Sequence, residues 1–339
     1  MLLATCPASA ADASDGGTSA TAPIIDTHAH PFRSVRRATL TPGHIIGAMD
    51  QFGVTLTVLL PPPFPAGHPG RYGPREFDYI VRSAPERFAF VAGGASLNGI
   101  IEHTAPENVT PEVIAAFRDE AEAIAKAGAA GYGEFAAEHF SSGRGNHPYE
   151  SVRPDHPLFL LLADIAATHG MPIDLHMEAV TEDRATPPRF AERGPNPATL
   201  KENITAFERL LAHNPNARII WAHAGWDNTG ERSIVLMRRL LAKHANLYMS
   251  IKLDERAQKR NSPFDADGQV KPQWLALLRE FPDRFMIGSD QFFTDDTDRL
   301  ASARRFVNAL PPDIVREVAS ENARRIYRLP VPPKGAAQR

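Results

Sequence analysis

The chain has 339 residues, of which 43% are hydrophobic and 23% charged, and its formal net charge is −3 at pH 7. This composition is typical of a globular protein and excludes collagen-like and largely disordered chains. The 37 basic and 40 acidic residues form no long block of one sign, so the charge gives no reason to expect a nucleic-acid or membrane partner. We therefore expect a small-molecule substrate. Whether the chain forms a homo-oligomer stays open.

Residues 1–22 are rich in Ala, Ser, Thr and Gly without helical or strand periodicity, and they predict a disordered leader or a truncated signal peptide. Ala8-Ser9-Ala10 has the form of a signal-peptidase site, although a basic start and a full apolar region are missing before it. A periplasmic or secreted location is therefore our prediction, with a cytoplasmic one as the alternative. The single cysteine, Cys6, excludes an internal disulfide and a cysteine-based metal site.

From residue 23 onward, short apolar runs rich in β-branched residues alternate with amphipathic helical stretches. The runs predict eight strands, at residues 23–28, 54–60, 87–93, 130–135, 171–176, 217–223, 246–251 and 284–290. Three cap-and-proline pairs predict helix starts, at Thr41-Pro42, Thr110-Pro111 and Asn196-Pro197. Three glycines fall where helices should end, at Gly53, Gly128 and Gly170.

A helix between consecutive strands brings the chain back to start the next strand alongside, so the strands are predicted to be parallel. An open doubly wound sheet would carry a glycine-rich phosphate loop after its first strand, but HAHPFR stands there. We predict an α/β fold, a (β/α)8 TIM barrel, which typically takes about 250 residues. It forms a single domain over residues 23–330, with an extra C-terminal helix at 311–329 and a flexible tail at 331–339.

Potential metal ligands gather at the predicted carboxyl ends of these strands. In IIDTHAHP, His28 and His30 share one face of the first strand because side chains alternate with a period of two. Three later strands end on His176, His223 and Asp290. The carboxyl end of a barrel is where barrel enzymes keep their chemistry, and imidazole and carboxylate groups suit a divalent ion. We expect metal-bound water as the nucleophile and Asp290 as the base that accepts its proton.

Glu134, in GYGEF, ends the fourth predicted strand and is a further candidate ligand that could bridge two ions. Its alternative role is a salt bridge to an arginine on the rim. His139 and His147, in the loop that follows, are left out of the metal set because loop histidines are usually exposed.

Four more residues are candidates for substrate binding. Lys252 follows the seventh strand and could hold a substrate carboxylate or phosphate, or instead pair with Asp254 or Glu255. Arg33 follows His30 by three residues, and its side chain either lies over the mouth of the predicted barrel or is exposed to solvent in the loop. Trp226 would form a pocket wall or pack at the rim, and Glu178 would contact the substrate or support a ligand.

This pattern resembles the amidohydrolase superfamily, and within it the amidohydrolase-related (amidohydrolase 2) branch of metal-dependent TIM-barrel hydrolases. The resemblance covers about residues 23–329 and rests on five motifs: DTHAHP, PIDLHMEA, IIWAHAGW, MIGSD and ENARRIYRL. It implies that His28, His30, His176 and Asp290 bind metal. It also implies that His223 either binds a second metal or polarises the substrate carbonyl.

The best-known binuclear members carry a carboxylated lysine where Glu134 stands, and GYGEF instead resembles the fourth strand of TatD-like relatives. The number of metal ions, one or two, therefore stays open. Zn²⁺ is the expected ion, with Mn²⁺ or another transition metal as the alternative. The expected activity is hydrolysis of an ester, lactone or amide of a small organic substrate. The alternative is a metal-dependent decarboxylase (lyase) of an aromatic or enoic acid, and a non-catalytic binding protein is a third hypothesis.

Overall fold

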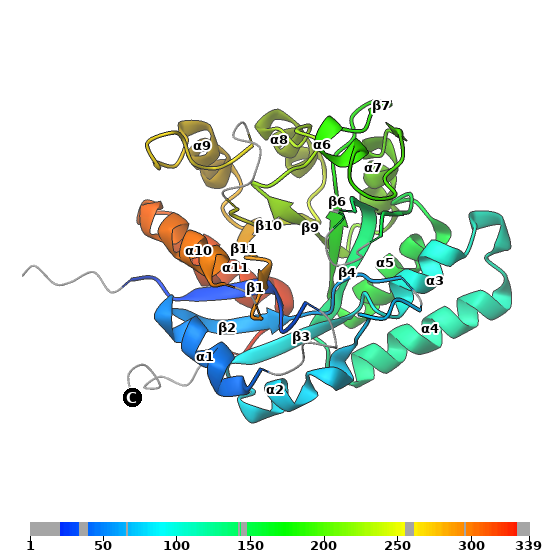
Figure 1. Ribbon diagram of the computed structural model, residues 1–339, viewed down its shortest axis with the longest axis horizontal. Helices are drawn as coiled ribbons and strands as arrows, with labels where there is room; N and C mark the ends of the chain where they lie inside the picture. Colours follow the sequence, from blue (N-terminus) through cyan, green and yellow to red (C-terminus); the bar gives the residue numbers. More distant parts are fainter. Residues whose placement is uncertain are drawn as a thin grey trace, which may run out of the picture.

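Eight parallel strands close into a barrel in the computed structural model, which describes residues 21–33, 40–65, 67–141, 143, 148–254, 261–294 and 296–330. The barrel strands are β1 (Ile24–His30), β2 (Val54–Leu59), β3 (Phe88–Gly93), β4 (Gly131–His139), β6 (Pro172–Met177), β9 (Arg218–Ala224), β10 (Leu247–Ile251) and β11 (Phe285–Ile287). Each pairs with the next in this order, and the pairing of β11 with β1, Ile287 opposite Asp26, closes the ring (Figure 1). The predicted (β/α)8 TIM barrel is confirmed.

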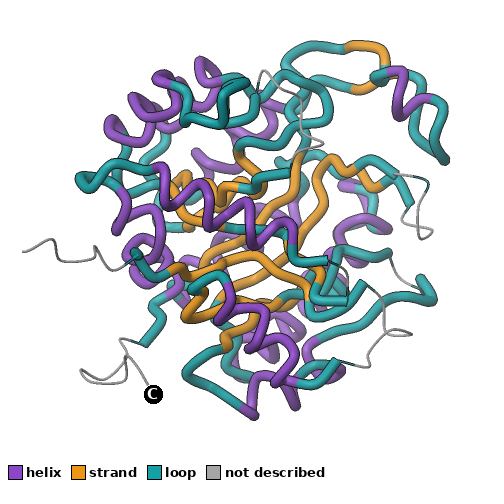
Figure 2. The backbone as a smooth tube through the Cα atoms, turned by 60° about the vertical axis from the view of Figure 1, so that its left-hand side comes forward, coloured by secondary structure: helices purple, strands orange, loops and turns teal. Residues whose placement is uncertain are grey.

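Helices surround the strands on the outside, as Figure 2 shows. They are α1 (Pro42–Gln51), η2 (Pro74–Glu76), α2 (Asp78–Ser83), α3 (Leu97–His103), η3 (Pro106–Asn108), α4 (Pro111–Lys126), α5 (Pro157–His169), α6 (Pro188–Ala191), α7 (Ile204–His213), α8 (Ile234–Lys243), α9 (Pro272–Glu280), α10 (Asp298–Ala309), the π-helical turn η4 (Glu317–Glu321) and α11 (Asn322–Tyr327). None of those in the described part of the chain combines the length and apolar character that crossing a membrane requires.

Two of the three predicted helix starts are confirmed. The hydroxyl groups of Thr41 and Thr110 accept hydrogen bonds from the backbone at the starts of α1 and α4. Gly53, Gly128 and Gly170 all have positive φ angles, as helix ends require. The prediction at Asn196-Pro197 is wrong, because the Asn196 amide instead bonds to Ser141 and to the backbone of Phe190 and Arg193, and the next long helix begins at Ile204.

The main apolar core lies between the barrel and its helices, where residues such as Phe117, Phe159 and Trp274 are almost fully buried. A smaller cluster joins the barrel strands to the C-terminal helix, with Ile25 and Met286 packed beside Ile326 and Tyr327. The predicted extra helix is therefore present as η4 and α11. Burying this apolar area is the main stabilising contribution to the fold.

Two additions extend the carboxyl side of the barrel. β5 (Glu150–Ser151) pairs antiparallel with the end of β4. After β6, the segment 178–203, called here the β6–α7 insertion, contains α6 and an antiparallel pair, β7 (Arg184–Ala185) with β8 (Thr199–Leu200). The predicted tail and all of the predicted leader but Thr21 and Ala22 lie outside the described residues.

Candidate metal centre

The predicted ligands gather at the carboxyl ends of the barrel strands, but not all of them end a strand. Glu134 lies in the middle of β4, which continues to His139, and the prediction that the strand ends there is wrong. β11 ends at Ile287, so Asp290 lies three residues beyond it. Asp290 still reaches β1, since its backbone N–H donates to the His28 carbonyl over 2.7 Å.

His28 is held from behind by a carboxylate. Its Nδ1 lies 3.2 Å from Asp174 Oδ2, and its Nε2 faces Glu134 Oε2 at 3.5 Å without a hydrogen-bond partner among the described residues. Burial opposes a charge on the imidazole, yet the carboxylates of Asp174 and Glu134 raise the pKa of His28 well above its usual value. A carboxylate behind a histidine is the arrangement that orients metal-binding imidazoles, so His28 presents Nε2 as a ligand.

His30 is oriented in the same way by a backbone carbonyl. Its Nδ1 lies 2.9 Å from the Leu60 carbonyl oxygen, which leaves Nε2 directed to Asp290 Oδ1 at 3.1 Å and to Glu134 Oε2 at 3.6 Å. The ring of Phe292 stacks on the imidazole at 4.4 Å between centroids. Both histidines of the DTHAHP motif therefore turn one nitrogen to the same place.

Glu134 lies at the centre of the cluster. Its carboxylate oxygens are 2.9 Å from His176 Nδ1, 3.3 Å from His223 Nε2 and within 3.6 Å of the Nε2 atoms of His28 and His30. Burial would raise the pKa of Glu134, but the charge on His28 and the hydrogen bonds from the other imidazoles hold it well below its usual value. The alternative of a rim salt bridge to arginine is not what the structure shows.

Asp290 is fixed by two cations. Its Oδ2 accepts from Lys252 Nζ at 2.5 Å and from Arg299 Nη1 at 2.8 Å, and Arg299 also donates to its backbone carbonyl. Burial would raise the pKa of Asp290, but Arg299 and Lys252 hold it well below the usual value. Its φ of 57° lies in the left-handed region, where non-glycine residues carry strain that is common at functional sites.

His223 also has a left-handed backbone, with φ of 69°. Burial and the positive charge of Lys252 hold its pKa well below the usual value, so the imidazole is neutral. Its ring lies 4.7 Å from those of both His28 and His176, measured between centroids. Its Nδ1 is buried and lacks a hydrogen-bond partner in the described ranges.

These side chains offer two overlapping sets of donor atoms for a metal ion. His28, His30 and Asp290 form one set, and His28, Glu134 and His223 form the other, each with its ligand atoms within 4.8 Å of one another. All five residues are buried. The nitrogen and oxygen donors, and the unpartnered Nε2 of His28, fit a divalent cation. His176 is in neither set, although it contacts Glu134.

The predicted substrate-binding residues differ in their surroundings. Lys252 is 3% exposed, pairs with Asp290 and lies with Nζ 3.6 Å from the centroid of the Trp226 ring. Of the two alternative partners, Asp254 also acts electrostatically on Lys252, and Glu255 lies outside the described residues. Arg33 is exposed and its guanidinium stacks on Phe292 at 4.3 Å.

Glu178 is buried beside His176 and accepts hydrogen bonds from Asn228. His139 was expected to be an exposed loop residue, but it is the last residue of β4. Its ring centroid lies 4.3 Å from that of His176. His147 lies outside the described residues.

Three contacting residues are absent from the predicted site. Asp174 precedes His176 by two positions on β6, and this period of two was the signal that it shares the inner face. Arg299 lies on α10 and Asn228 follows β9, where no motif marks either of them. Gly288 is also required, because a Cβ there would lie 2.7 Å from that of Ser250 and 3.1 Å from that of His28.

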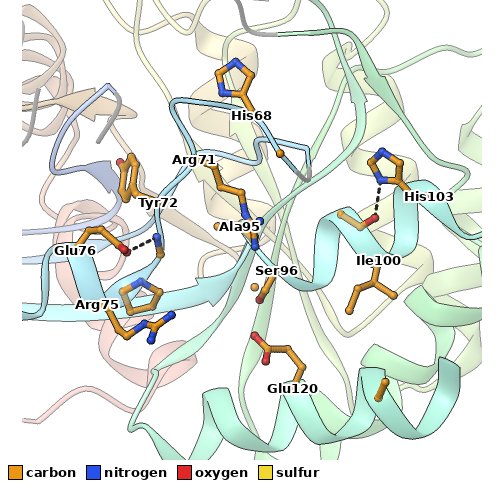
Figure 3. A pocket seen from close by; sticks show the side chains of 16 residues that line it. His68, Arg71, Tyr72, Arg75, Glu76, Ala95, Ser96, Ile100, His103 and Glu120 are labelled. Carbon is orange, nitrogen blue, oxygen red and sulfur yellow. Dashed lines mark hydrogen bonds between the residues drawn. The ribbon is translucent and has the colours of Figure 1, made fainter. Parts of the chain in front are cut away.

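A separate pocket of about 920 Å³ lies between segment 67–76 and helices α3 and α4 (Figure 3). Arg71, Arg75, His103 and Glu120 are among its lining residues, and none of the predicted site residues lines it. Tyr72, on its wall, donates from its hydroxyl to the Phe32 carbonyl at 2.6 Å, just beyond the DTHAHP motif. The pocket therefore adjoins the loop after β1 without containing the metal cluster.

Residues 25–329 match a protein family described as Amidohydrolase. Among solved structures, the chain is similar to 5-carboxyvanillate decarboxylase from Sphingomonas paucimobilis, with 16% identity and a TM-score of 0.51 over 91% of this chain and 99% of that one. It is also similar to a dihydroxybenzoic acid decarboxylase from Polaromonas sp. JS666 with bound manganese, with 15% identity and a TM-score of 0.52 over 91% and 97%.

A third similar structure is a probable 2-pyrone-4,6-dicarboxylic acid hydrolase from Acinetobacter baumannii, with 12% identity and a TM-score of 0.48 over 90% of this chain and 99% of that one. At these identities the likenesses show the fold alone. No curated protein matches the sequence.

Proposed function

Since this chain belongs to the amidohydrolase family, we propose that it is a metal-dependent hydrolase of small organic esters, lactones or amides. The residues that would hold the ion are His28, His30 and Asp290, with Glu134 and His223 as the second set and His176 next to them. A divalent ion bound there, Zn²⁺ or else Mn²⁺, would supply an activated water molecule and polarise the substrate carbonyl.

The observation that carries this proposal is the pairing of Asp290 with two cations, the buried Lys252 and the half-buried Arg299. Lys252 and Arg299 both contact Oδ2, while Oδ1 is directed to His30. Two such partners keep the side chain as a carboxylate, which can only accept hydrogen bonds. Asp290 therefore starts in the ionised form that can accept a proton from an attacking water molecule, as hydrolysis requires, although its two cationic partners make it a weaker base than a free carboxylate.

His223 is suited to support the same reaction as a hydrogen-bond donor. A neutral imidazole has one N–H donor and one acceptor nitrogen. With its pKa lowered by burial and by Lys252, His223 can donate its N–H to the oxygen on which negative charge develops. The alternative role of His223 is to bind a second metal ion through one of its ring nitrogens.

Decarboxylation of an aromatic or enoic acid is the second candidate, and Lys252 favours it. The ammonium group is buried and lies over Trp226, so an acid substrate could exchange with Asp290 as its partner. This reaction also needs an Asp290 that is protonated at the start, so that it can deliver a proton to the new C–H bond, whereas hydrolysis starts from the ionised carboxylate that the two ion pairs favour. We therefore place hydrolysis first.

The test begins with the metal content per chain, followed by assays of a lactone, ester, amide and acid panel on the same sample in ¹⁸O-labelled water. Hydrolysis incorporates one labelled oxygen atom into the product, whereas decarboxylation releases carbon dioxide without it. Asp290→Asn should abolish turnover and retain part of the metal, and the exposed Asp267→Asn should leave both unchanged. Carbon dioxide release as the sole reaction, or full activity of Asp290→Asn, would refute the proposal.

A further inference from the structure

The β6–α7 insertion is joined to the candidate metal centre by a chain of polar contacts. Arg189, on α6, donates from Nη2 to the side-chain oxygen of Asn228 at 2.8 Å and to its carbonyl at 3.3 Å. Asn228 in turn donates from its side-chain amide to Glu178 Oε1 and from its backbone N–H to Oε2 at 2.9 Å. Glu178 Oε1 lies 3.6 Å from His176 Nε2.

Every step of this chain lies away from solvent except at Arg189. The exposed fractions are 6% for Asn228, 3% for Glu178 and 5% for His176. Both Glu178 oxygens accept from Asn228, so Glu178 is held by the protein itself. Of the two roles that the sequence suggested for Glu178, contact with the substrate or support of a ligand, this arrangement fits the second.

We propose that Asn228 is a positioning residue: it holds Glu178 against His176, and Arg189 of the insertion fixes the direction of its amide. The inference rests on the proposed function only in that His176 contacts Glu134, a member of the second set of candidate metal ligands. An asparagine suits this place because its amide oxygen accepts from Arg189 while its NH₂ group donates to the glutamate. These contacts connect the β6–α7 insertion to His176.

Asn228→Asp is the sharpest test, because it keeps the shape of the side chain and replaces the NH₂ donor by an oxygen facing Glu178. We expect the affinity for Zn²⁺, measured by chelator competition, to fall about 10–100-fold, as is usual when a supporting partner of a ligand is lost. The visible spectrum of the Co²⁺-loaded protein should also change. A residue needed only for folding would leave the affinity and spectrum of the folded fraction unaltered.

Arg189→Ala is the second variant, because it leaves both Asn228–Glu178 bonds available and removes the hydrogen bonds from Arg189 to Asn228, together with its stacking on Phe190. We expect a smaller loss of affinity, about twofold to tenfold, with partial recovery in Arg189→Lys. Arg193→Ala is the matched control, since Arg193 is an exposed arginine of the same insertion. It should behave as the wild type.

Wild-type affinity and an unchanged Co²⁺ spectrum in a folded Asn228→Asp protein would overturn the proposal. If that variant does not fold, unchanged values in Arg189→Ala overturn it instead. These readouts do not depend on which reaction the enzyme catalyses. A metal-loaded wild type without hydrolytic turnover would therefore contradict the proposed function alone.

Discussion

Glu138 offers a quantitative test of the electrostatics beside the centre. It lies on β4 and is 4% exposed, with Oε2 accepting from the Ser151 hydroxyl at 3.0 Å. Its Oε1 is buried without a hydrogen-bond partner among the residues that the structure describes. Burial outweighs the hydrogen bonds from Tyr149 and Ser151 and raises the pKa of Glu138 from 4.5 to about 7.

The sign of the effect follows from linkage. Because the pKa is higher in the folded protein than in the unfolded chain, Glu138 costs no stability below pH 4.5 and costs progressively more as the pH rises to about 7. Each pH unit in this window is worth about 1.4 kcal/mol. The full cost of ionising the buried carboxyl group is therefore about 3 kcal/mol above pH 7.

Glu138→Gln keeps the shape of the side chain and removes its ionisation. We expect the free energy of unfolding of this variant, relative to the wild type, to rise by about 3 kcal/mol between pH 4 and pH 8. Urea denaturation at each pH unit in this range measures it, and the exposed Glu182→Gln serves as the control. Parallel pH profiles for Glu138→Gln and the wild type would refute the reasoning.

Three further predictions concern single contacts and the metal. Tyr72→Phe should cost about 1–3 kcal/mol in urea denaturation, because it leaves the buried Phe32 carbonyl unpaired; no change would mean that water replaces the hydroxyl. Asn322→Ala should cost about 2 kcal/mol or more, since its amide donates to the Pro282 and Phe285 carbonyls. Exhaustive chelation should abolish turnover and lower the melting temperature, and added Zn²⁺ or Mn²⁺ should restore both; activity that survives chelation contradicts the metal centre.

The barrel was predictable because its strands are continuous apolar runs separated by helices with clear end signals. All eight predicted strands are present, since a parallel strand buried on both faces leaves a pattern that local sequence carries. Strand ends were less predictable. β4 runs on past Glu134 because its end pairs with β6 on one side and with β5 on the other, and a two-residue partner such as Glu150–Ser151 leaves no pattern of its own.

The gathering of the histidines and Asp290 was predictable for a related reason. Parallel strands of a closed barrel end on one face, so residues far apart in sequence meet if each stands near a strand end. The partners that hold them were predictable only where they share a strand, as Asp174 does with His176. Arg299 and Asn228 come from a helix and a loop, and their approach depends on how these elements pack.

Lys252 illustrates why the local sequence is incomplete as a guide to such a site. Its neighbour Asp254 does act on it electrostatically, but the salt bridge of Lys252 is with Asp290, which is distant in sequence. Asp254 also lies 3.7 Å from Arg299, which contacts Asp290 as well. The charge state of Asp290, on which our choice of hydrolysis depends, is therefore set by two cations that the MIGSD motif does not contain: Lys252, directly after β10, and Arg299, on α10.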